Sequence, residues 1–373
     1  MKTSSDVIVV GMGIVGLAQA WAAAKRGKSV IVIDRQPYAV GASVRNFGFV
    51  TITGQERGEF WNLARRAQEL WLEVCEQAHI PILHKGLAMV ARRPEAAAVL
   101  DSFLDTEMGD GCKLVSGRSF LATHSGLPLH TPSAVLVSPH EVRVEARDAL
   151  AQITNWLQQR WGVRFETLTA VLHVSDGLVS TSRGDFKADQ VFVCPGDDLS
   201  SLYPDLMAQH GVSRCTLQML RLEPVGFALP HAIMSDLGLV RYRGYGELAG
   251  LDALKARLER EQGEQLAAGV HLIVVQSADG SLVVGDSHVY GQAEKPFTSQ
   301  SFEHLILDEF TKVFNVPTPK VFERWIGTYA TAPGQQWFVA APEPKVRLTV
   351  VTTGAGMSTA FGIGEKVVQD ALG

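Results

Sequence analysis

Three glycines near the start of the chain have the spacing of a phosphate-binding turn. Gly11, Gly13 and Gly16 form the pattern G-x-G-x-x-G directly after a strand-like run over residues 6–10. The first glycine allows a tight turn, the second lets a pyrophosphate approach the backbone, and the third lets a helix pack closely on a strand. Asp34 follows a second apolar run and is placed to accept hydrogen bonds from a ribose. This order of features indicates a dinucleotide site rather than a purely structural turn.

The elements that must position this turn are a strand, a helix and a second strand. We expect them over residues 6–10, about 14–26, and 29–33. The helix N-terminus, at Ile14 and Val15, presents free N–H groups and the positive end of the helix dipole to the phosphates. The helix is rich in alanine, which suits close packing on a sheet.

A second glycine-rich turn lies near the end of the chain. A strand expected over residues 346–353 runs into the turn 354–364, which opens the last helix. A nicotinamide dehydrogenase has no need of such a second loop. A flavin requires backbone donors at the N1/C2-carbonyl edge of its ring, where a helix N-terminus stabilises the negative charge of the reduced form. The C-terminal turn therefore favours FAD over NAD.

With these motifs, the chain resembles the FAD-dependent amine and amino-acid oxidases of the D-amino acid oxidase, glycine oxidase and sarcosine oxidase group. The matching strings are G-M-G-I-V-G (11–16), Asp34-Arg35, G-A-S-V-R (41–45), A-D-Q-V-F-V-C-P-G-D-D-L-S (188–200) and the segment 325–365. The motif and the resemblance together imply FAD contacts at Gly11, Gly13, Ile14, Val15, Gly16, Asp34, Arg35, Ser43, Val44, Arg45, Asn46, Val171, Cys194, Gly196, Gly327, Tyr329, Gly354, Gly356, Met357, Ser358 and Thr359.

The resemblance also predicts the fold class and the domains. We expect an α/β protein with a Rossmann-like FAD-binding domain and an α+β substrate domain that contains an antiparallel sheet. The FAD-binding domain is discontinuous (1–81, 139–210 and 326–373), and the substrate domain takes 82–138 and 211–325. Long helices are expected over about 56–78 and 144–159, and Asp-Gly hairpins at 176–177 and 279–280.

Three positions depart from the patterns of this group. Gly327 stands at about the place where monomeric sarcosine oxidases carry flavin on a cysteine, so we expect the FAD to be non-covalent. Tyr329 is at or near the position of the arginine that holds the substrate carboxylate in glycine and D-amino acid oxidases. Ser358 replaces the lysine that sarcosine oxidases use. The absence of both usual carboxylate anchors argues against an ordinary α-amino acid substrate.

Short strings resemble a narrower clade, which is proposed to oxidise aminophosphonates. They are S-V-R-N-F-G-F-V (43–50), G-D-S-H (285–288) and G-A-G-M-S-T-A-F-G (354–362). The implied reaction oxidises the C–N bond of a small anionic amine by hydride transfer to flavin N5, with imine hydrolysis to an aldehyde and reoxidation by O2 to H2O2. The alternatives are a glycine/sarcosine-type oxidase, a dehydrogenase with a non-oxygen acceptor, and a nucleotide-binding sensor without turnover.

Cations and aromatic residues are the candidates for binding such a substrate. Arg45 is the leading one, and it could instead contact flavin phosphate or form a structural ion pair. In the run 240–245, strand alternation would place Arg241 and Arg243 on one face, directed either to the site or to solvent. Tyr242 and Tyr245 could form a lid.

Other candidates carry a simple alternative. His288 is expected to end a strand, where a surface histidine is the competing interpretation. Tyr329 lies on a strand that matches a pocket strand of the resembled group. His140 and Arg324 are weaker candidates. No obligatory general base is evident, and the four cysteines show neither C-x-x-C pairing nor zinc spacing, so we expect free thiols and no metal site.

The composition is that of an ordinary enzyme. The chain has 373 residues, 46% of them hydrophobic and 20% charged, with a net charge of −5. A negative net charge argues against nucleic acid or an anionic membrane as partner. The first apolar run is interrupted by glycines and Asp34, so it predicts neither a signal peptide nor a membrane span. We therefore expect a cytoplasmic protein.

Overall fold

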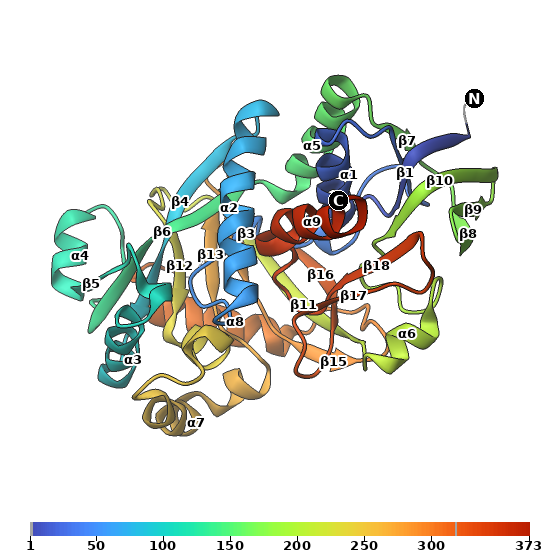
Figure 1. The fold of residues 1–373 in the computed structure, drawn as a ribbon. Coiled ribbons are helices and arrows are strands. Elements are labelled where there is room, and N and C mark those ends of the chain that lie inside the picture. The colour runs from blue at the N-terminus through green and yellow to red at the C-terminus, as the bar shows by residue number, and fades with distance from the viewer. Residues whose placement is uncertain (1–2, 318) are drawn as a thin grey trace.

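Two sheets organise the chain in the computed structural model, which describes residues 3–317 and 319–373 (Figure 1). The first sheet has the strand order β17-β18-β10-β1-β2-β7, and the β8–β9 hairpin extends it from β10. Its central pairs are parallel, as expected for a Rossmann-like unit. The strands are β1 (Ser4–Val10), β2 (Val30–Ile33), β7 (Arg164–Glu166), β8 (Val171–Ser175), β9 (Leu178–Thr181), β10 (Gly184–Val193), β17 (Trp337–Ala340) and β18 (Val346–Val351).

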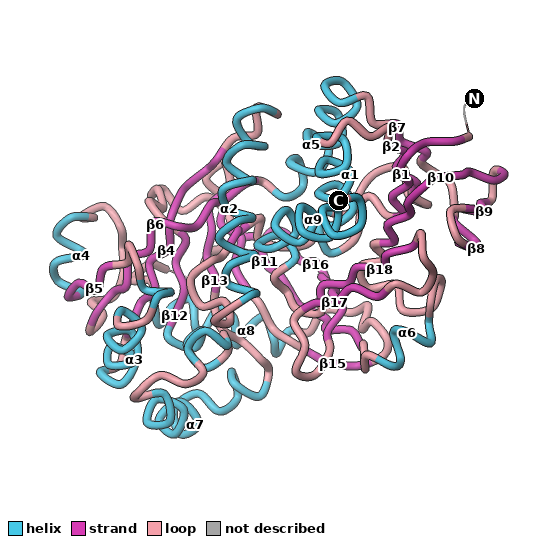
Figure 2. The backbone as a smooth tube through the Cα atoms, viewed as in Figure 1, coloured by secondary structure: helices cyan, strands magenta, loops and turns pink. Residues whose placement is uncertain are grey.

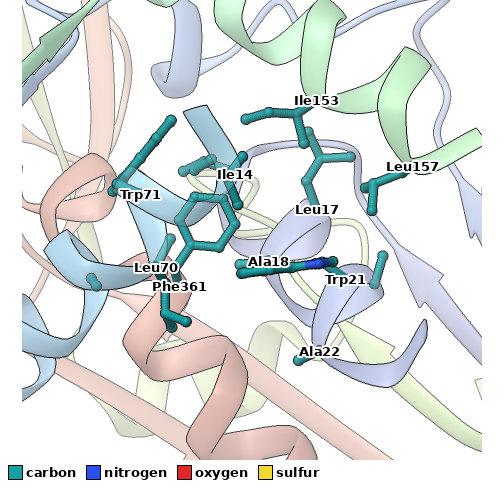
Figure 3. Close-up of a cluster of buried hydrophobic side chains, with 14 of the residues drawn as sticks. Ile14, Leu17, Ala18, Trp21, Ala22, Leu70, Trp71, Ile153, Leu157 and Phe361 are labelled. Atoms are coloured by element: carbon teal, nitrogen blue, oxygen red, sulfur yellow. The ribbon is translucent and has the colours of Figure 1, made fainter. Parts of the chain in front are cut away.

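The first sheet buries both of its faces. In β1, Val7 and Val9 point into one apolar cluster and Ile8 and Val10 into another, because successive side chains of a strand point to opposite faces. The first cluster contains helix residues such as Trp21 (Figure 3). Four helices contribute to that cluster: α1 (Ile14–Lys25), α2 (Glu59–Gln77), α5 (Ala146–Trp161) and α9 (Gly356–Leu372).

Two glycines let α9 pack closely on its neighbours. A Cβ at Gly362 would lie 2.3 Å from the carbonyl oxygen of Leu63 in α2, and one at Gly364 would lie 2.9 Å from the Cβ of Ala18 in α1. These glycines were expected in the turn that opens the last helix. The structure places them inside that helix, where they allow close packing, and only the first part of the run forms the turn.

The second sheet is larger and mostly antiparallel. Its order is β15-β11-β14-β13-β12-β4-β6-β3, with β16 paired to β11 and β5 to β6; only the β4–β12 pair is parallel. Its strands are β3 (Phe49–Val50), β4 (Ile82–Ala91), β5 (Lys113–Ser116), β6 (Ala134–Val144), β11 (Ser213–Leu222), β12 (Ala232–Ser235), β13 (Ile273–Gln276), β14 (Leu282–Gly285), β15 (Val289–Gly291) and β16 (Val321–Thr331).

Helices and apolar clusters cover both faces of this sheet. Leu87 and Met89 of β4 join one cluster, and Ala88 and Val90 join the other. Figure 2 shows the two groups of strands with the remaining helices around them. These helices are α3 (Pro94–Leu104), α4 (Gly117–Thr123), α6 (Pro204–Gln209), α7 (Leu251–Ala267) and α8 (Gln300–Val313).

Most expected elements are present with small shifts of their ends. Both Asp-Gly hairpins are confirmed, because β8 pairs antiparallel with β9 and β13 with β14. Two expected domain boundaries fall inside strands of the second sheet: β6 runs through residues 138 and 139, and β16 runs through 325 and 326. Hydrogen bonding between strands therefore continues across both boundaries.

The described residues include no helix that is long and apolar enough to cross a membrane. The four cysteines, as expected, are free.

Candidate active site

A cavity of about 330 Å³ is lined by residues of both sheets. The first sheet supplies Thr349 and Val351 of β18 and the turn that follows. The second supplies part of β16 and Phe49 of β3. The cavity lies where parallel strands of the first sheet end, which is the usual place for a ligand in such sheets.

The N-terminal glycines form a cradle that no larger residue fits. Gly11 has φ +106°, and a Cβ there would lie 2.4 Å from the carbonyl oxygen of Cys194. A Cβ at Gly16 would lie 2.0 Å from the carbonyl oxygen of Gly11. The Ile14 amide at the start of α1 donates to the hydroxyl oxygen of Ser43 at 3.0 Å. The phosphate-binding turn and the 43–46 loop are therefore neighbours, although 29 residues separate the two bonded groups.

Asp34 holds the backbone of this turn in place. Its two carboxylate oxygens accept hydrogen bonds from the amides of Met12 at 2.7 Å and Gln36 at 2.8 Å. The sequence led us to expect ribose as its partner. The structure adds these two backbone contacts: the one to Met12 links Asp34 to the turn between β1 and α1, and the one to Gln36 lies in the loop after β2. Ribose binding by Asp34 stays a prediction.

The C-terminal turn lies on the cavity wall, as the sequence led us to expect. Residues 352–358 line the cavity, and α9 begins at Gly356 with no side chain capping its N-terminus. The free N–H groups of such a terminus favour negative charge. The indole N–H of Trp71 donates to the carbonyl oxygen of Met357 at 2.8 Å, which ties the turn to the helical core.

The three positions that depart from the resembled group also lie on this cavity. A Cβ at Gly327 would lie 2.9 Å from the carbonyl oxygen of Arg45, so no larger side chain fits there without a shift. The ring of Tyr329 lies 3.3 Å from the position of a Cβ on Gly354. The hydroxyl oxygen of Ser358 accepts the Thr51 amide at 2.8 Å in a buried bond, so Ser358 acts as a structural link to the second sheet.

The predicted FAD-contacting residues divide into two groups. Those that line the cavity are Ile14, Val15, Ser43, Arg45, Asn46, Gly196, Gly327, Tyr329, Gly354, Gly356, Met357 and Ser358. Those outside its wall are Gly11, Gly13, Gly16, Asp34, Arg35, Val44, Val171, Cys194 and Thr359. The roles of both groups in binding FAD stay predictions.

The run 240–245 is not a strand, which corrects the sequence analysis. It comprises the end of the 3₁₀ helix η3 (Asp236–Val240) and the whole of η4 (Arg243–Tyr245). The Gly244 amide donates to the carbonyl oxygen of Gly54 at 2.9 Å, and a Cβ on Gly244 would lie 2.4 Å from the Gln55 carbonyl oxygen. This tertiary contact shapes the turn. Tyr245 is fully buried against Phe103, so it forms core and not a lid.

Arg241 and Arg243 both line the cavity but have different partners. The half-buried Arg241 donates from Nη2 to the hydroxyls of Tyr290 at 3.1 Å and Tyr329 at 3.3 Å. Arg243 is exposed and lies 3.6 Å from a carboxylate oxygen of Glu56. Among the described residues, no carboxylate forms an ion pair with Arg241. Its charge is thus available to an anion that enters the cavity.

Arg45 lies on the cavity wall and also forms an ion pair, and its contact with substrate or flavin stays a prediction. It lines the cavity, its Nε donates to the carbonyl oxygen of Val40 at 2.7 Å, and its Nη1 lies 3.6 Å from a carboxylate oxygen of Glu294. The ion pair is exposed on both sides, and such pairs contribute little to stability. An incoming anion could therefore displace Glu294 at small cost.

The three remaining candidates separate clearly. His288 is 7% exposed and lines the cavity between β14 and β15, so the surface interpretation is wrong. His140 lies outside the cavity wall; its Nδ1 accepts a hydrogen bond from Arg65 and its Nε2 donates one to the carbonyl oxygen of Asp110. Arg324 is also outside, in an ion pair with Glu303.

Sequence reasoning missed three residues beside His288. His271, Asp286 and Tyr290 line the same wall. Asp286 stood inside the string G-D-S-H but was not singled out, and His271 lies in an apolar stretch where no local pattern marks it. Only the pairing of β13, β14 and β15 within one sheet brings these residues together.

Comparison with known proteins assigns the family. A model of the DAO family, described as FAD dependent oxidoreductase, matches residues 6–369. The chain belongs to this family. The match runs over nearly the whole chain, so it includes both glycine-rich turns and the cavity between them.

Individual relatives of this DAO-family chain include monomeric sarcosine oxidases. The one from Bacillus sp. (strain B-0618) is 32% identical over 204 residues, which are 52% of this chain and 52% of that protein. The one from Arthrobacter sp. (strain TE1826) is 28% identical over 124 residues, 31% and 32% of the two chains. The chain thus spans about half the length of the first curated relatives it matches.

Solved structures of low sequence identity share the fold over nearly the full chain. Glycine oxidase from Geobacillus kaustophilus is 17% identical with a TM-score of 0.78, covering 99% of this chain and 95% of that one. L-proline dehydrogenase from P. horikoshii is 18% identical with a TM-score of 0.79, covering 99% and 93%. The α/β fold with mixed sheets is therefore shared with both.

The residues present fit the FAD of this family. The glycine cradle lets a pyrophosphate reach the backbone between β1 and α1, where the dipole of α1 is favourable. The uncapped start of α9 offers N–H groups to an electron-rich ring edge on the cavity wall. None of the four cysteines lines the cavity, and non-covalent binding of FAD stays a prediction.

Proposed function

We propose that this protein uses FAD to oxidise the C–N bond of a small anionic amine. The observation that carries the proposal is Arg241, which lines the cavity, donates hydrogen bonds to two neutral hydroxyls and forms no ion pair with a carboxylate of the described residues. One of those hydroxyls belongs to Tyr329, whose ring lies against the glycine turn at the start of α9. An anion on Arg241 would hold the rest of a small substrate near that turn.

Within this class we propose an aminophosphonate, such as N-methyl-2-aminoethylphosphonate. A phosphonate carries up to two negative charges on three oxygens and is best met by several N–H donors, for which guanidinium groups are suited. Arg45, Arg241 and Arg243 all line the cavity. Tyr329 and Ser358 stand where carboxylate anchors are usual in the resembled oxidases, which supports an anion other than an α-carboxylate.

The cofactor supplies the redox chemistry and the chain supplies binding and orientation. When bound, FAD would accept a hydride from the α-carbon of the neutral amine and would later pass the two electrons to O2, giving H2O2. The imine formed from the substrate would be hydrolysed by water to an aldehyde and an amine. The arginines fix the anionic end of the substrate. The apolar wall, which includes Leu217 and Ile273, limits water around the reacting carbon.

A carboxylated amine such as sarcosine is the second candidate substrate. The identity of 32% with a monomeric sarcosine oxidase over about half of the chain favours it. A dehydrogenase that passes electrons to another acceptor remains the alternative to an oxidase.

One experiment separates these functions. The purified FAD-loaded protein is mixed without oxygen with N-methyl-2-aminoethylphosphonate and, separately, with sarcosine, and the flavin absorbance is followed. Fast bleaching by the phosphonate with little or none by sarcosine supports the proposal, and the reverse result refutes it. Air is then admitted: reoxidation with stoichiometric H2O2 supports an oxidase, and a persistently reduced flavin indicates another electron acceptor.

A further inference from the structure

Three buried titratable side chains meet on one wall of the cavity. One side-chain nitrogen or oxygen atom from each of His271, Asp286 and His288 lies within 4.8 Å of the corresponding atoms of the other two. The Nδ1 atom of His271 is 3.2 Å from Oδ1 of Asp286, and Nε2 of His288 is 3.7 Å from Oδ2. None of the three is more than 7% exposed. The carboxyl group of Asp286 therefore lies between two imidazole rings.

The backbone fixes the orientation of one ring. The carbonyl oxygen of Gly269 lies 2.8 Å from Nδ1 of His288, and because a carbonyl only accepts, Nδ1 carries the hydrogen. In a neutral ring Nε2 is then unprotonated, and it is the atom that faces Asp286. A Cβ on Gly269 would lie 2.7 Å from the Cβ of His288, so only glycine allows this close approach.

The charges around the cluster leave one group that titrates near neutral pH. Burial and the positive charge of Arg241 hold the pKa of both histidines well below the usual range, so both rings are neutral. Burial raises the pKa of the Asp286 carboxyl to about 7, and the charge of Arg241 opposes part of that rise.

Three other groups that face the cluster, Tyr242, Tyr329 and Cys215, have a raised pKa and keep their protons in this range. Burial raises the pKa of the Tyr242 and Tyr329 hydroxyls, and raises that of the Cys215 thiol to about 11. Tyr290 accepts a hydrogen bond from Arg241 at the edge of the same wall. Arg241 stays charged throughout, as guanidinium does in proteins.

The proposed reaction requires that the substrate ammonium lose a proton. An alkylammonium has a pKa of about 10, so nearly all substrate arrives protonated at pH 7. Only the neutral amine has the nitrogen lone pair that assists hydride departure. A general base acts best when its pKa lies near the working pH and its atoms can reach the proton.

We propose that Asp286 binds the substrate ammonium and takes its proton, and that His271 and His288 are positioning residues for the Asp286 carboxyl group. The unprotonated Nε2 of His288 can accept a hydrogen bond from that group once it has taken the proton. This inference rests on the proposed oxidation of an amine. The N–H bond of the ammonium breaks, its electron pair stays on nitrogen, and an O–H bond forms on Asp286. This step involves no oxidation or reduction.

The arrangement of the wall suits a substrate with opposite charges at its two ends. The rings of His288 and Tyr329 are 6.3 Å apart, and the Tyr329 hydroxyl accepts a hydrogen bond from Arg241. The arginine can therefore hold the anion while Asp286 meets the ammonium. Two histidines and a carboxylate can also ligate a divalent metal ion, and the measurements below test that alternative.

The test compares flavin reduction by the wild type and Asp286→Asn across pH 6–10, without oxygen, using whichever of N-methyl-2-aminoethylphosphonate or sarcosine bleaches the wild type. We expect the wild-type limiting rate to titrate near pH 7. For Asp286→Asn we expect a rate about 10²- to 10⁴-fold lower at pH 7, recovering as the pH approaches the pKa of the amine itself. A His288→Gln variant should keep the high-pH rate and shift the titration. His140→Gln, outside the cavity, is the matched control.

A second measurement does not depend on turnover. Ethylphosphonate, which has no amine, should perturb the flavin spectrum of both the wild type and Asp286→Asn, which would show that the variant is folded, loaded and able to bind the anion. An unchanged pH profile in Asp286→Asn, or a wild-type rate that titrates only near pH 10, would overturn the role of Asp286. Stoichiometric metal in the purified protein, with a rate that falls on chelation, would overturn it in favour of a metal site. Failure of both amines to bleach the wild type would instead refute the proposed function.

Discussion

Replacement of Arg241 by methionine should lower kcat/KM far more for an amine that carries an anionic group than for an amine that lacks one. Methionine keeps much of the length of the side chain and removes the positive charge and every N–H donor. The two hydroxyl partners of Arg241 are neutral, so removing the charge leaves no unbalanced carboxylate in an ion pair with it. The main effect should therefore fall on the bound anion and not on folding.

The size of the effect follows from the contact that is lost. Removing one partner of a hydrogen-bonded, largely desolvated charge pair costs about 2–5 kcal/mol. At about 1.4 kcal/mol for each factor of ten, kcat/KM for an aminophosphonate should fall about 30- to 4,000-fold. An amine of similar length without an anionic group makes no such contact, so its kcat/KM should change less than about tenfold.

The assay is steady-state oxidation of N-methyl-2-aminoethylphosphonate and of N-methylpropylamine by both proteins. Arg243→Met is the matched control, because Arg243 lines the same cavity but is paired with Glu56 at 3.6 Å. It should lose less activity on the anionic substrate than Arg241→Met. Equal losses on both amines, or a larger loss in the control, would refute the assignment of Arg241 as the anion anchor.

Three further predictions concern stability and cofactor binding. Burial lowers the pKa of His84 to about 3, so the unfolded chain binds more protons than the folded chain between about pH 3 and 6.5, and stability falls as the pH falls through that window. Because glutamine does not titrate, the unfolding free energy of His84→Gln should fall by about 2 kcal/mol less than that of the wild type between pH 8 and pH 5, measured from denaturant midpoints at both pH values. Gly16→Ala should yield protein without FAD, whereas Gly41→Ala, with open space around it and φ −83°, should stay yellow. Phe361→Ala, between two tryptophan rings, should cost about 3–5 kcal/mol of unfolding free energy; a loss under 1 kcal/mol would contradict close packing there.

Local patterns predicted the first strand, helix and turn because each of their requirements lies within a short stretch. About thirty residues contain the glycine that the structure shows with φ +106°, the alanine-rich helix and the buried strand. The same holds for the Asp-Gly hairpins, where the turn residues themselves specify the chain reversal. For these elements the residue types were sufficient.

The run 240–245 shows where a local pattern fails. Its alternation of cations and aromatics suggested a strand, but Gly244 lies against the backbone of residues 54 and 55, almost two hundred positions away in sequence. That contact sets two 3₁₀ turns, buries Tyr245 and still directs Arg241 into the cavity. Arg241 was correctly expected at the cavity, but the strand that was expected to place it there does not exist.

The sequence by itself determined a flavin-type nucleotide fold, since its two glycine turns each carry their own geometric requirements. It also marked Arg241 by its charge and its aromatic neighbours, and marked Tyr329 and His288 through segments that resemble those of related oxidases. Only the tertiary structure decided their surroundings. Among the three arginines of the cavity, Arg241 is the one without an ion pair to a carboxylate of the described residues, and His271 and Asp286 stand beside His288. Charge pairing and burial depend on contacts between segments far apart in sequence, and these in turn set the pKa values. No local pattern contains that information.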